Sequence, residues 1–239
     1  MPVLGASFDG RWGMPAGDHS RALSFLDAEN DTSSFRVLWV GDPSALPLGS
    51  WELADGLAYA TTDGGTPCLD DLVVGSDDGA TGLVADAVEL ARSGQTARLG
   101  RLLAPMGVRY VVIAERLAPA PFATEPRPAP SGFVASLDAQ LDLEPLDVPA
   151  GLTVYRNRAA APTRAAVPLD PAPPIDGGIA AAATVDLSSA TPVLERETGH
   201  LRWSGTVPAD SQILIAEASS SRWKLRIGGR SVQADKPFG

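Results

Sequence analysis

The chain has 239 residues, of which 44% are apolar and 20% charged, a composition typical of a protein with a buried core and not of a disordered chain. Its net charge of −10 argues against binding to nucleic acid and against adhesion to anionic lipid, because both require clustered lysine and arginine. The single cysteine, Cys68, excludes an internal disulfide and a cysteine metal cluster, and no segment approaches the roughly 20 apolar residues of a membrane-spanning helix.

Strand patterns alternate with a helix pattern in the first half of the chain. Residues 35–41 form a nearly continuous apolar run that Asp42-Pro43 ends, as expected of a buried central strand. Residues 56–61 predict a weaker strand, and residues 108–113 predict a second buried strand. Between them, the apolar positions of residues 99–106 have the spacing of an amphipathic helix. These segments predict layers of helices against a sheet.

The same alternation continues to about residue 160. Val134, Leu137 and Leu141 have the spacing of a further helix stripe, and residues 152–155 predict a further strand. Alternating strands and helices favour a sheet with parallel neighbours. The sequence therefore predicts an α/β layered domain with a partly parallel sheet over residues 1–160.

The pattern changes in the last third of the chain. Residues 161–180 contain five prolines followed by two glycines, which predicts a linker. Residues 181–239 show short strand patterns and no helix, which predicts a smaller all-β domain of the sandwich or jelly-roll type. A closed sandwich has about seven strands, and only about four are visible here, so we expect this domain to be truncated.

The last strand patterns predict a hairpin. Trp223, Leu225 and Ile227 alternate with basic residues, and Gly228-Gly229 supplies the tight turn. We expect these three apolar side chains to face a core whose other half is partly absent. We also expect residues beyond Ala234 to be poorly packed, or to pair with a neighbouring chain, because an open strand edge seeks a partner.

Sequence patterns of the common catalytic sites are absent. The chain contains no nucleophile elbow, no phosphate-binding loop, no dinucleotide fingerprint and no zinc-protease motif. Its two histidines, His19 and His200, lie far apart in sequence, which argues against a histidine triad or a multi-histidine metal site.

Four aspartates flank a short apolar stretch and are candidate metal ligands. They are Asp70, Asp71, Asp77 and Asp78. Clustered carboxylates suit Ca²⁺, but the spacing does not match an EF-hand loop. The alternative, which we favour, is that they are turn and helix-capping residues, so that no cofactor is expected.

Tryptophans are candidate sugar-binding residues. Trp12 and Trp51 lie in Gly-rich loops, where an indole is free to stack on a sugar ring. The other three occupy inward strand positions and are expected to pack in the core. They are Trp39, Trp203 and Trp223.

Five segments, taken in order, resemble one family of bacterial membrane proteins. The segments are FDGRWGMP (8–15), FRVLWVGDP (35–43), GVRYVV (107–112), VYRN (154–157) and LIAEASSSRWKLRIGG (214–229). Together they resemble the extracytoplasmic region of polytopic proteins of the YfhO type, and especially of actinobacterial membrane glycosyltransferases that carry such a region after their transmembrane helices.

The resemblance implies an extracytoplasmic domain on the cell-envelope side of the plasma membrane, anchored by transmembrane segments that this chain lacks. Its partners would be the transmembrane part of the same polypeptide and an envelope glycan or glycolipid. The parent protein would build envelope polysaccharide or glycolipid, with its transferase chemistry located elsewhere, so the resemblance assigns no catalytic residue here. In that family the β-domain continues with further strands.

Two alternatives remain from the residues themselves. One is a stand-alone carbohydrate hydrolase that uses paired aspartates such as Asp42 and Asp63, which would need to lie about 5–9.5 Å apart in one cleft. Asp42 follows the strongest strand at its carboxyl end, where open α/β sheets bind ligands, although we favour the alternative that it forms an Asp-Pro turn ending the strand. The other alternative is a purely structural or assembly module.

Overall fold

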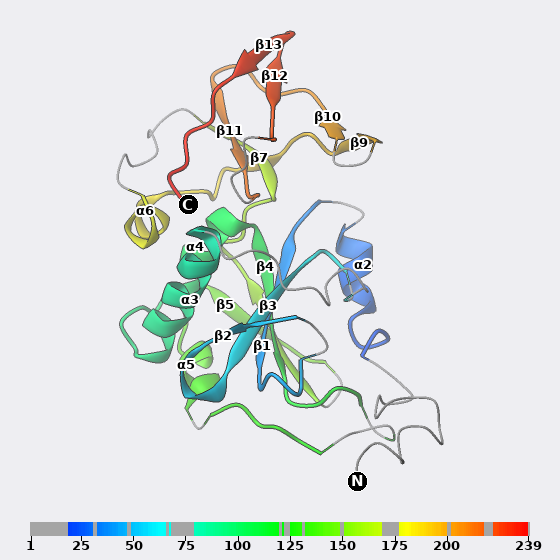
Figure 1. The fold of residues 1–239 in the computed structure, drawn as a ribbon, viewed down its shortest axis with the longest axis vertical. Coiled ribbons are helices and arrows are strands. Elements are labelled where there is room, and N and C mark those ends of the chain that lie inside the picture. Colours follow the sequence, from blue (N-terminus) through cyan, green and yellow to red (C-terminus); the bar gives the residue numbers. More distant parts are fainter. Residues whose placement is uncertain are drawn as a thin grey trace.

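A six-stranded sheet forms the centre of the molecule in the computed structural model (Figure 1). The structure describes residues 19–30, 33–46, 49–65, 67, 79–119, 121, 125–130, 132–148, 151–168, 177–199, 202–217 and 222–238. The strand order is β2-β3-β1-β4-β6-β5. The strands are β1 (Arg36–Gly41), β2 (Trp51–Glu52), β3 (Ala58–Asp63), β4 (Val108–Ala114), β5 (Leu143–Leu146) and β6 (Leu152–Asn157).

Strand β1 lies in the middle of this sheet, as its apolar sequence predicts. It pairs in parallel with β4 and antiparallel with β3, and the side chains of residues 37–40 are buried on both faces. Gly41 permits the close approach of β4, because a Cβ atom at that position would lie 2.5 Å from the carbonyl oxygen of Ala114. The predicted α/β fold with a partly parallel sheet is confirmed.

Helices cover both faces of the sheet (Figure 1). On one face, α3 (Gly79–Arg92), α4 (Leu99–Leu103) and α5 (Phe133–Asp138) contribute to the main apolar core. On the other face, α2 (Ser24–Asn30) contributes Leu26 to a second apolar core, together with Leu23 just before the helix. Two 3₁₀ turns, η1 (Ala54–Gly56) and η3 (Ala104–Met106), complete this part. None of the helices in the described ranges has the length and apolarity needed to cross a membrane.

The predicted helices are confirmed with one correction. Residues 99–106 form α4 followed by η3, and Phe133 and Leu137 of α5 are buried. Leu141, expected on the buried stripe of that helix, is 72% exposed. The reason is that α5 ends at Asp138, so the helical spacing does not extend to residue 141.

The first turn of α4 is capped by side chains that follow α5, about 40 residues later in the chain. The carboxylate of Asp142 accepts hydrogen bonds from the backbone N–H groups of Gly100 (3.0 Å) and Arg101 (2.8 Å). Gln140 accepts a third from the N–H of Leu99 (2.8 Å). Both side chains are buried, and they satisfy N–H groups that a helix leaves without intrahelical partners. This contact fixes α4 against the β5–β6 edge of the sheet.

A region of small antiparallel sheets follows the large sheet, which confirms the predicted order of an α/β domain and then a β region. One sheet has the order β11-β7-β8, and two others are the pairs β9–β10 and β12–β13. The strands are β7 (Arg164–Pro168), β8 (Thr191–Pro192), β9 (Arg196–Gly199), β10 (Arg202–Ser204), β11 (Ser211–Ile215), β12 (Leu225–Ile227) and β13 (Arg230–Val232). β7 falls inside residues 161–180, where we expected a linker, and a short helix, α6 (Ile179–Thr184), extends into residues 181–239, where we expected none.

The C-terminal hairpin is present, but its surroundings differ from the expectation. Gly228 and Gly229 have φ values of 55° and 80°, which a tight turn of this kind requires. Trp223 and Ile227 are 40% and 47% exposed, so neither is a core residue. The expectation that residues beyond Ala234 pack poorly is wrong for Phe238, since its ring packs against the main apolar core.

Removing the distant cap of α4 should destabilise the fold. Asp142→Ala would leave two buried N–H groups without an acceptor, and we expect it to lower the free energy of unfolding by about 2–4 kcal/mol, measured by urea denaturation. Asp147→Ala, which removes an exposed aspartate five residues later, is the matched control and should cost less than about 0.5 kcal/mol. Equal costs for the two variants would contradict the capping role.

Candidate functional site

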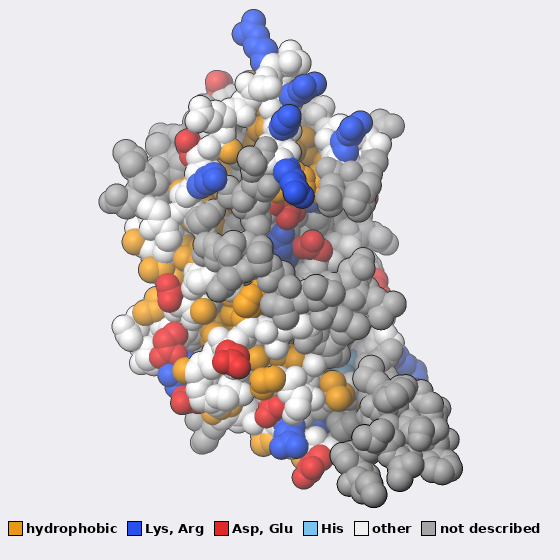
Figure 2. All heavy atoms as spheres, in the orientation of Figure 1, with side chains coloured by type: hydrophobic (Ala, Val, Ile, Leu, Met, Phe, Trp, Pro, Cys, Tyr) orange, Lys and Arg blue, Asp and Glu red, His pale blue; other side chains and the backbone are white. Residues whose placement is uncertain are grey.

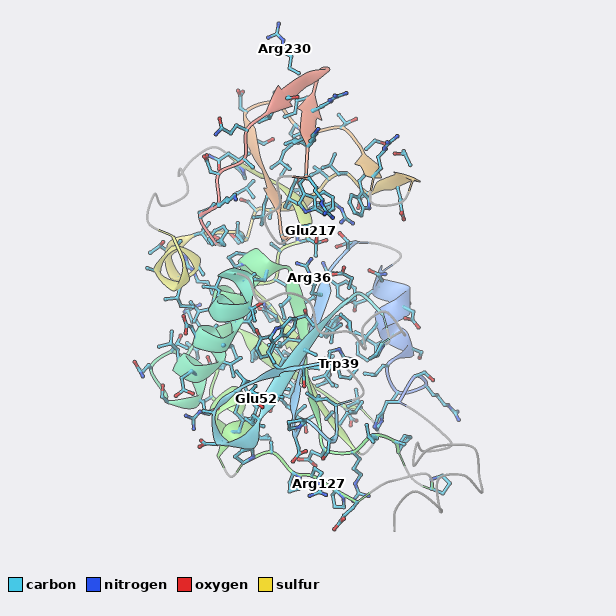
Figure 3. All side chains as sticks on the ribbon, in the orientation of Figure 1. Arg36, Trp39, Glu52, Arg127, Glu217 and Arg230 are labelled. Atoms are coloured by element: carbon cyan, nitrogen blue, oxygen red, sulfur yellow. The ribbon has the colours of Figure 1, made fainter. Side chains whose placement is uncertain are left out.

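The described polar and aromatic side chains converge where the large sheet meets the β region. We call this set the junction cluster. It consists of Arg36, Asp63, Arg164, Trp203, Glu217 and Trp223. Figure 3 shows Arg36 and Glu217 pointing toward one another across the boundary between the two parts.

Arg36 occupies the centre of the junction cluster. It begins β1 and faces Asp63, which ends the antiparallel strand β3. Its Nε donates to Asp63 Oδ1 and its Nη2 to Glu217 Oε2, both at 2.9 Å. Its Nη1 donates to the carbonyl oxygens of Met106, at 3.1 Å, and Ala216. The guanidinium therefore binds groups from both parts of the molecule at once.

The aromatic half of the cluster lies on the β region. Arg164 Nη1 is 3.7 Å from Glu217 Oε1, and its guanidinium carbon lies 4.3 Å from the ring centre of Trp203. Trp203 in turn contacts Trp223, with ring centres 5.8 Å apart. A guanidinium over an indole is a favourable cation–π arrangement, particularly where water is excluded. These contacts link the two indoles to the carboxylate of Glu217 through Arg164.

Burial shifts the pKa values of Glu217 and Arg164. Desolvation raises the pKa of Glu217 above its ordinary value, and the charge of Asp63 raises it further, although Arg36 and Arg164 oppose this. Desolvation likewise lowers the pKa of Arg164, against the attraction of Glu217. The side chains of Arg36, Arg164 and Glu217 are 15%, 13% and 19% exposed. The cluster therefore holds charge in a poorly solvated place, where each charge needs its partner.

The cluster reaches solvent at both ends. Asp63 is 77% exposed at the end on the large sheet, and Trp223 is 40% exposed at the end on the β region. The expectation that Trp203 and Trp223 lie in a core is wrong: Trp223 is exposed just before β12, and Trp203 is only half-buried, because the sheets of the β region have two or three strands each and form no closed sandwich. Trp39, by contrast, is buried as predicted and donates to the hydroxyl of Thr62 at 3.0 Å.

Asp42 lies at the opposite end of β1 from the junction cluster. Its carboxylate accepts hydrogen bonds from the hydroxyl and the N–H of Ser44, and these bonds, aided by the charge of Arg127, lower its pKa. This is the turn geometry that we named as the alternative to a ligand site. A small hollow of about 160 Å³ lies beside this turn and is lined by Ser44, Ala45, Leu117, Glu125 and Arg127.

The strand register separates Asp42 from Asp63. Arg36 pairs with Asp63 at one end of β1, and Gly41, just before Asp42, pairs with Ala58 at the other. Six residues of extended strand span roughly 20 Å, well beyond the separation of about 5–9.5 Å that glycoside hydrolysis needs. The two aspartates therefore cannot work on one substrate bond, and the hydrolase built on this pair is excluded.

The remaining predicted site residues do not come together in the part of the chain that the structure describes. The ring of Trp51 stacks on Tyr59, with centres 5.3 Å apart and an angle of 26°, so one of its faces is occupied. Trp12 and the four candidate metal ligands lie outside the described residues: Asp70, Asp71, Asp77 and Asp78. Among the described residues, no three His, Cys, Asp or Glu side chains are grouped so as to hold a metal ion.

Sequence patterns alone missed most of the junction cluster. Arg36 and Glu217 are 181 positions apart, and each lies next to an apolar strand without forming a motif. The available signal was a charged residue at the edge of an apolar run, as at Arg36 before Val37 and at Glu217 after Ala216. Such a position places a charge at the boundary of a core, where it needs a partner.

Breaking the cluster at its centre should cost far more than breaking it at its exposed end. Glu217→Ala leaves Arg36 and Arg164 without their buried partner, and we expect a loss of about 3 kcal/mol in the free energy of unfolding. Asp63→Ala, at the solvent end of the same network, should cost less than about 1 kcal/mol. Urea denaturation of both variants measures the difference, and a larger effect from Asp63→Ala would contradict the arrangement.

The raised pKa of Glu217 should appear in the pH dependence of stability. Between the ordinary glutamate pKa of 4.5 and the higher folded value, the folded chain retains a proton that the unfolded chain has lost. Stability contributed by this group is therefore full below pH 4.5 and decreases as the pH rises through the folded pKa. We expect the wild-type chain to lose stability relative to Glu217→Gln over this window, measured by urea denaturation at a series of pH values. A difference that is constant with pH would contradict the raised pKa.

Comparisons of the chain with protein-family models, with curated proteins and with solved structures found no match.

Proposed function

We propose that the chain is a non-catalytic extracytoplasmic domain of a bacterial membrane glycosyltransferase that takes part in the synthesis of envelope polysaccharide or glycolipid, and that it binds glycan at Trp223. The order of the five sequence segments described above supports the family and the location. The transmembrane part of the same polypeptide would then be its permanent partner.

Glycan binding is supported above all by the exposed indole of Trp223. An aromatic ring that binds a sugar must be exposed on one face and held firmly on the other, so that stacking costs little conformational entropy. Trp223 meets both conditions, because it is 40% exposed and its ring contacts Trp203, which is itself covered by Arg164. The exposed cations beside it, Lys224 and Arg226, add hydrogen-bond donors for sugar hydroxyls or acidic groups.

The proposal of a non-catalytic role is supported by the state of the carboxylates. Asp42 and Asp63 lie at opposite ends of β1. Glu217 and Asp63 do lie near one another, but both bind the guanidinium of Arg36, which also donates to two backbone carbonyls. A carboxylate pair held in this way stabilises the boundary between the two parts of the molecule and leaves no room for a scissile bond between them.

A titration tests this function directly. The 239-residue chain is titrated with a panel of envelope oligosaccharides by isothermal titration calorimetry, and we expect binding that Trp223→Ala weakens about tenfold, which corresponds to the loss of about 1.4 kcal/mol of ring stacking. Leu141→Ala, which truncates an even more exposed apolar side chain outside the cluster, is the control and should bind as the wild type does. Absence of binding across the panel would favour the structural or assembly module instead.

A further inference from the structure

The C-terminal hairpin carries a charge opposite to that of the rest of the chain. Residues 218–239 contain five lysines and arginines and one aspartate, a net charge of +4, so the preceding residues carry −14. Figure 2 shows the Lys and Arg side chains gathered at this end of the molecule and the Asp and Glu side chains spread mainly over the other. The charge of the whole chain, which argued against anionic lipid, therefore does not describe this end.

Three of these cations are available to an external partner. Lys224, Arg226 and Arg230 are exposed, and no carboxylate within the described ranges forms an ion pair with them. Figure 3 shows Arg230 extending beyond the end of the hairpin, at the extremity of the molecule. A cation in this position interacts freely with an external anion, since no internal partner competes for it.

The same hairpin exposes apolar side chains. Ile227 pairs with Arg230, and Val232 pairs with Leu225, so these four side chains share one face of the two strands. Ile227 is 47% and Val232 44% exposed. Arg230 thus lies on the same face as these aliphatic side chains, and Arg226 lies on the opposite face of the same short hairpin.

A hollow lies beneath this apolar face. Its volume is about 290 Å³, and its apolar lining comes from Leu194, Val207, Ile213, Leu225 and Ile227. The first three of these residues belong to the body of the β region, and the last two to β12. The hollow therefore separates this face of the hairpin from the body of the β region, which leaves Ile227 and Val232 partly exposed.

We propose that the hairpin β12–β13 docks onto the surface of an anionic phospholipid bilayer. Arg226, Arg230 and Lys224 bind lipid phosphates, and Ile227 and Val232 enter the boundary between headgroups and acyl chains. A bilayer interface offers both of these environments within a short depth, which suits a surface that mixes cations with aliphatic side chains. Repulsion between the lipid and the −14 charge of the rest of the chain orients the molecule with its hairpin toward the membrane.

Other anionic partners explain less of this surface. A nucleic acid or an acidic glycan would account for the cations but not for the exposed Ile227 and Val232. The acidic surface of a second copy of the chain would need a complementary concave patch to receive a protruding tip. Bilayer docking goes beyond the proposed glycan binding and does not depend on it, since the variants that test it leave Trp223 intact.

The charge part is tested by co-sedimentation of the 239-residue chain with vesicles. We expect binding to phosphatidylcholine vesicles that contain about 30% phosphatidylglycerol, weakening as salt is added, and no binding to phosphatidylcholine alone. Arg226→Glu/Arg230→Glu should lower the partition coefficient about tenfold or more. Arg21→Glu/Arg98→Glu changes the net charge equally at two exposed arginines on the body and should have little effect. Equal losses from the two double variants, or no binding to anionic vesicles, would overturn the proposal.

The apolar part is tested by Ile227→Ser/Val232→Ser, with unfolding by urea as a check that the variant is folded. Loss of the two aliphatic side chains should weaken vesicle binding about fivefold and leave its salt dependence unchanged. Unchanged vesicle binding by this variant, together with equally tight binding of the wild type to heparin or to a single-stranded oligonucleotide, would reassign the hairpin to a polyanion. A dimer in light scattering that Arg226→Glu/Arg230→Glu dissociates, with no vesicle binding, would reassign it to a second copy of the chain.

Discussion

The guanidinium of Arg36 joins the two parts of this molecule. It begins the central strand of the large sheet and binds Glu217 and the Ala216 carbonyl at the end of β11 in the β region. A guanidinium is suited to this position because its fixed planar donors bind several acceptors at once and it stays charged when partly buried. The buried charge of Arg36 is stabilised because each of its three nitrogens donates to an acceptor, and two of these acceptors, on Ala216 and Glu217, determine where the β region lies on the sheet. Thr163 supports it nearby, with its N–H donating to the Ser34 carbonyl at 3.1 Å.

The two proposed surfaces follow from how this junction is built. Because Arg164 pairs with Glu217, its guanidinium is held over Trp203, and Trp203 positions the exposed Trp223. The hairpin β12–β13 begins two residues after Trp223, so the proposed glycan-binding indole and the cations of the hairpin lie on one short stretch of chain. A domain that bound lipid through this hairpin would hold Trp223 close to the membrane surface, where glycolipid headgroups are found. The two proposals share Lys224 and Arg226, whereas Trp223 belongs only to the glycan site and Arg230, Ile227 and Val232 only to the bilayer contact.

The sequence predicted the parts of the fold that are determined by residues adjacent in the chain. The buried strands β1 and β4 are continuous apolar runs, and the hairpin turn is determined by Gly228-Gly229. Contacts between distant residues could not be predicted in this way. Asp142 caps a helix that begins 43 positions earlier, and Glu217 pairs with an arginine 181 positions away. The same limit explains why Trp223 was wrongly expected in a core. Alternation of apolar and polar residues identifies one face of a strand, but it does not show whether another layer covers that face.

One backbone contact joins the residue before α6 to the last described residues of the chain, and it has a mechanical consequence. The N–H of Gly178 donates to the carbonyl oxygen of Pro237 at 2.8 Å, and the neighbouring Phe238 packs against the main core. The chain between them leaves α6, forms the small sheets and the hairpin, and returns to the same point. A force applied to the hairpin is therefore carried by two segments of the chain, the one that starts at Gly178 and the one that ends at Phe238. A domain attached to a moving fluid surface by its tip would resist lateral drag through this closed loop.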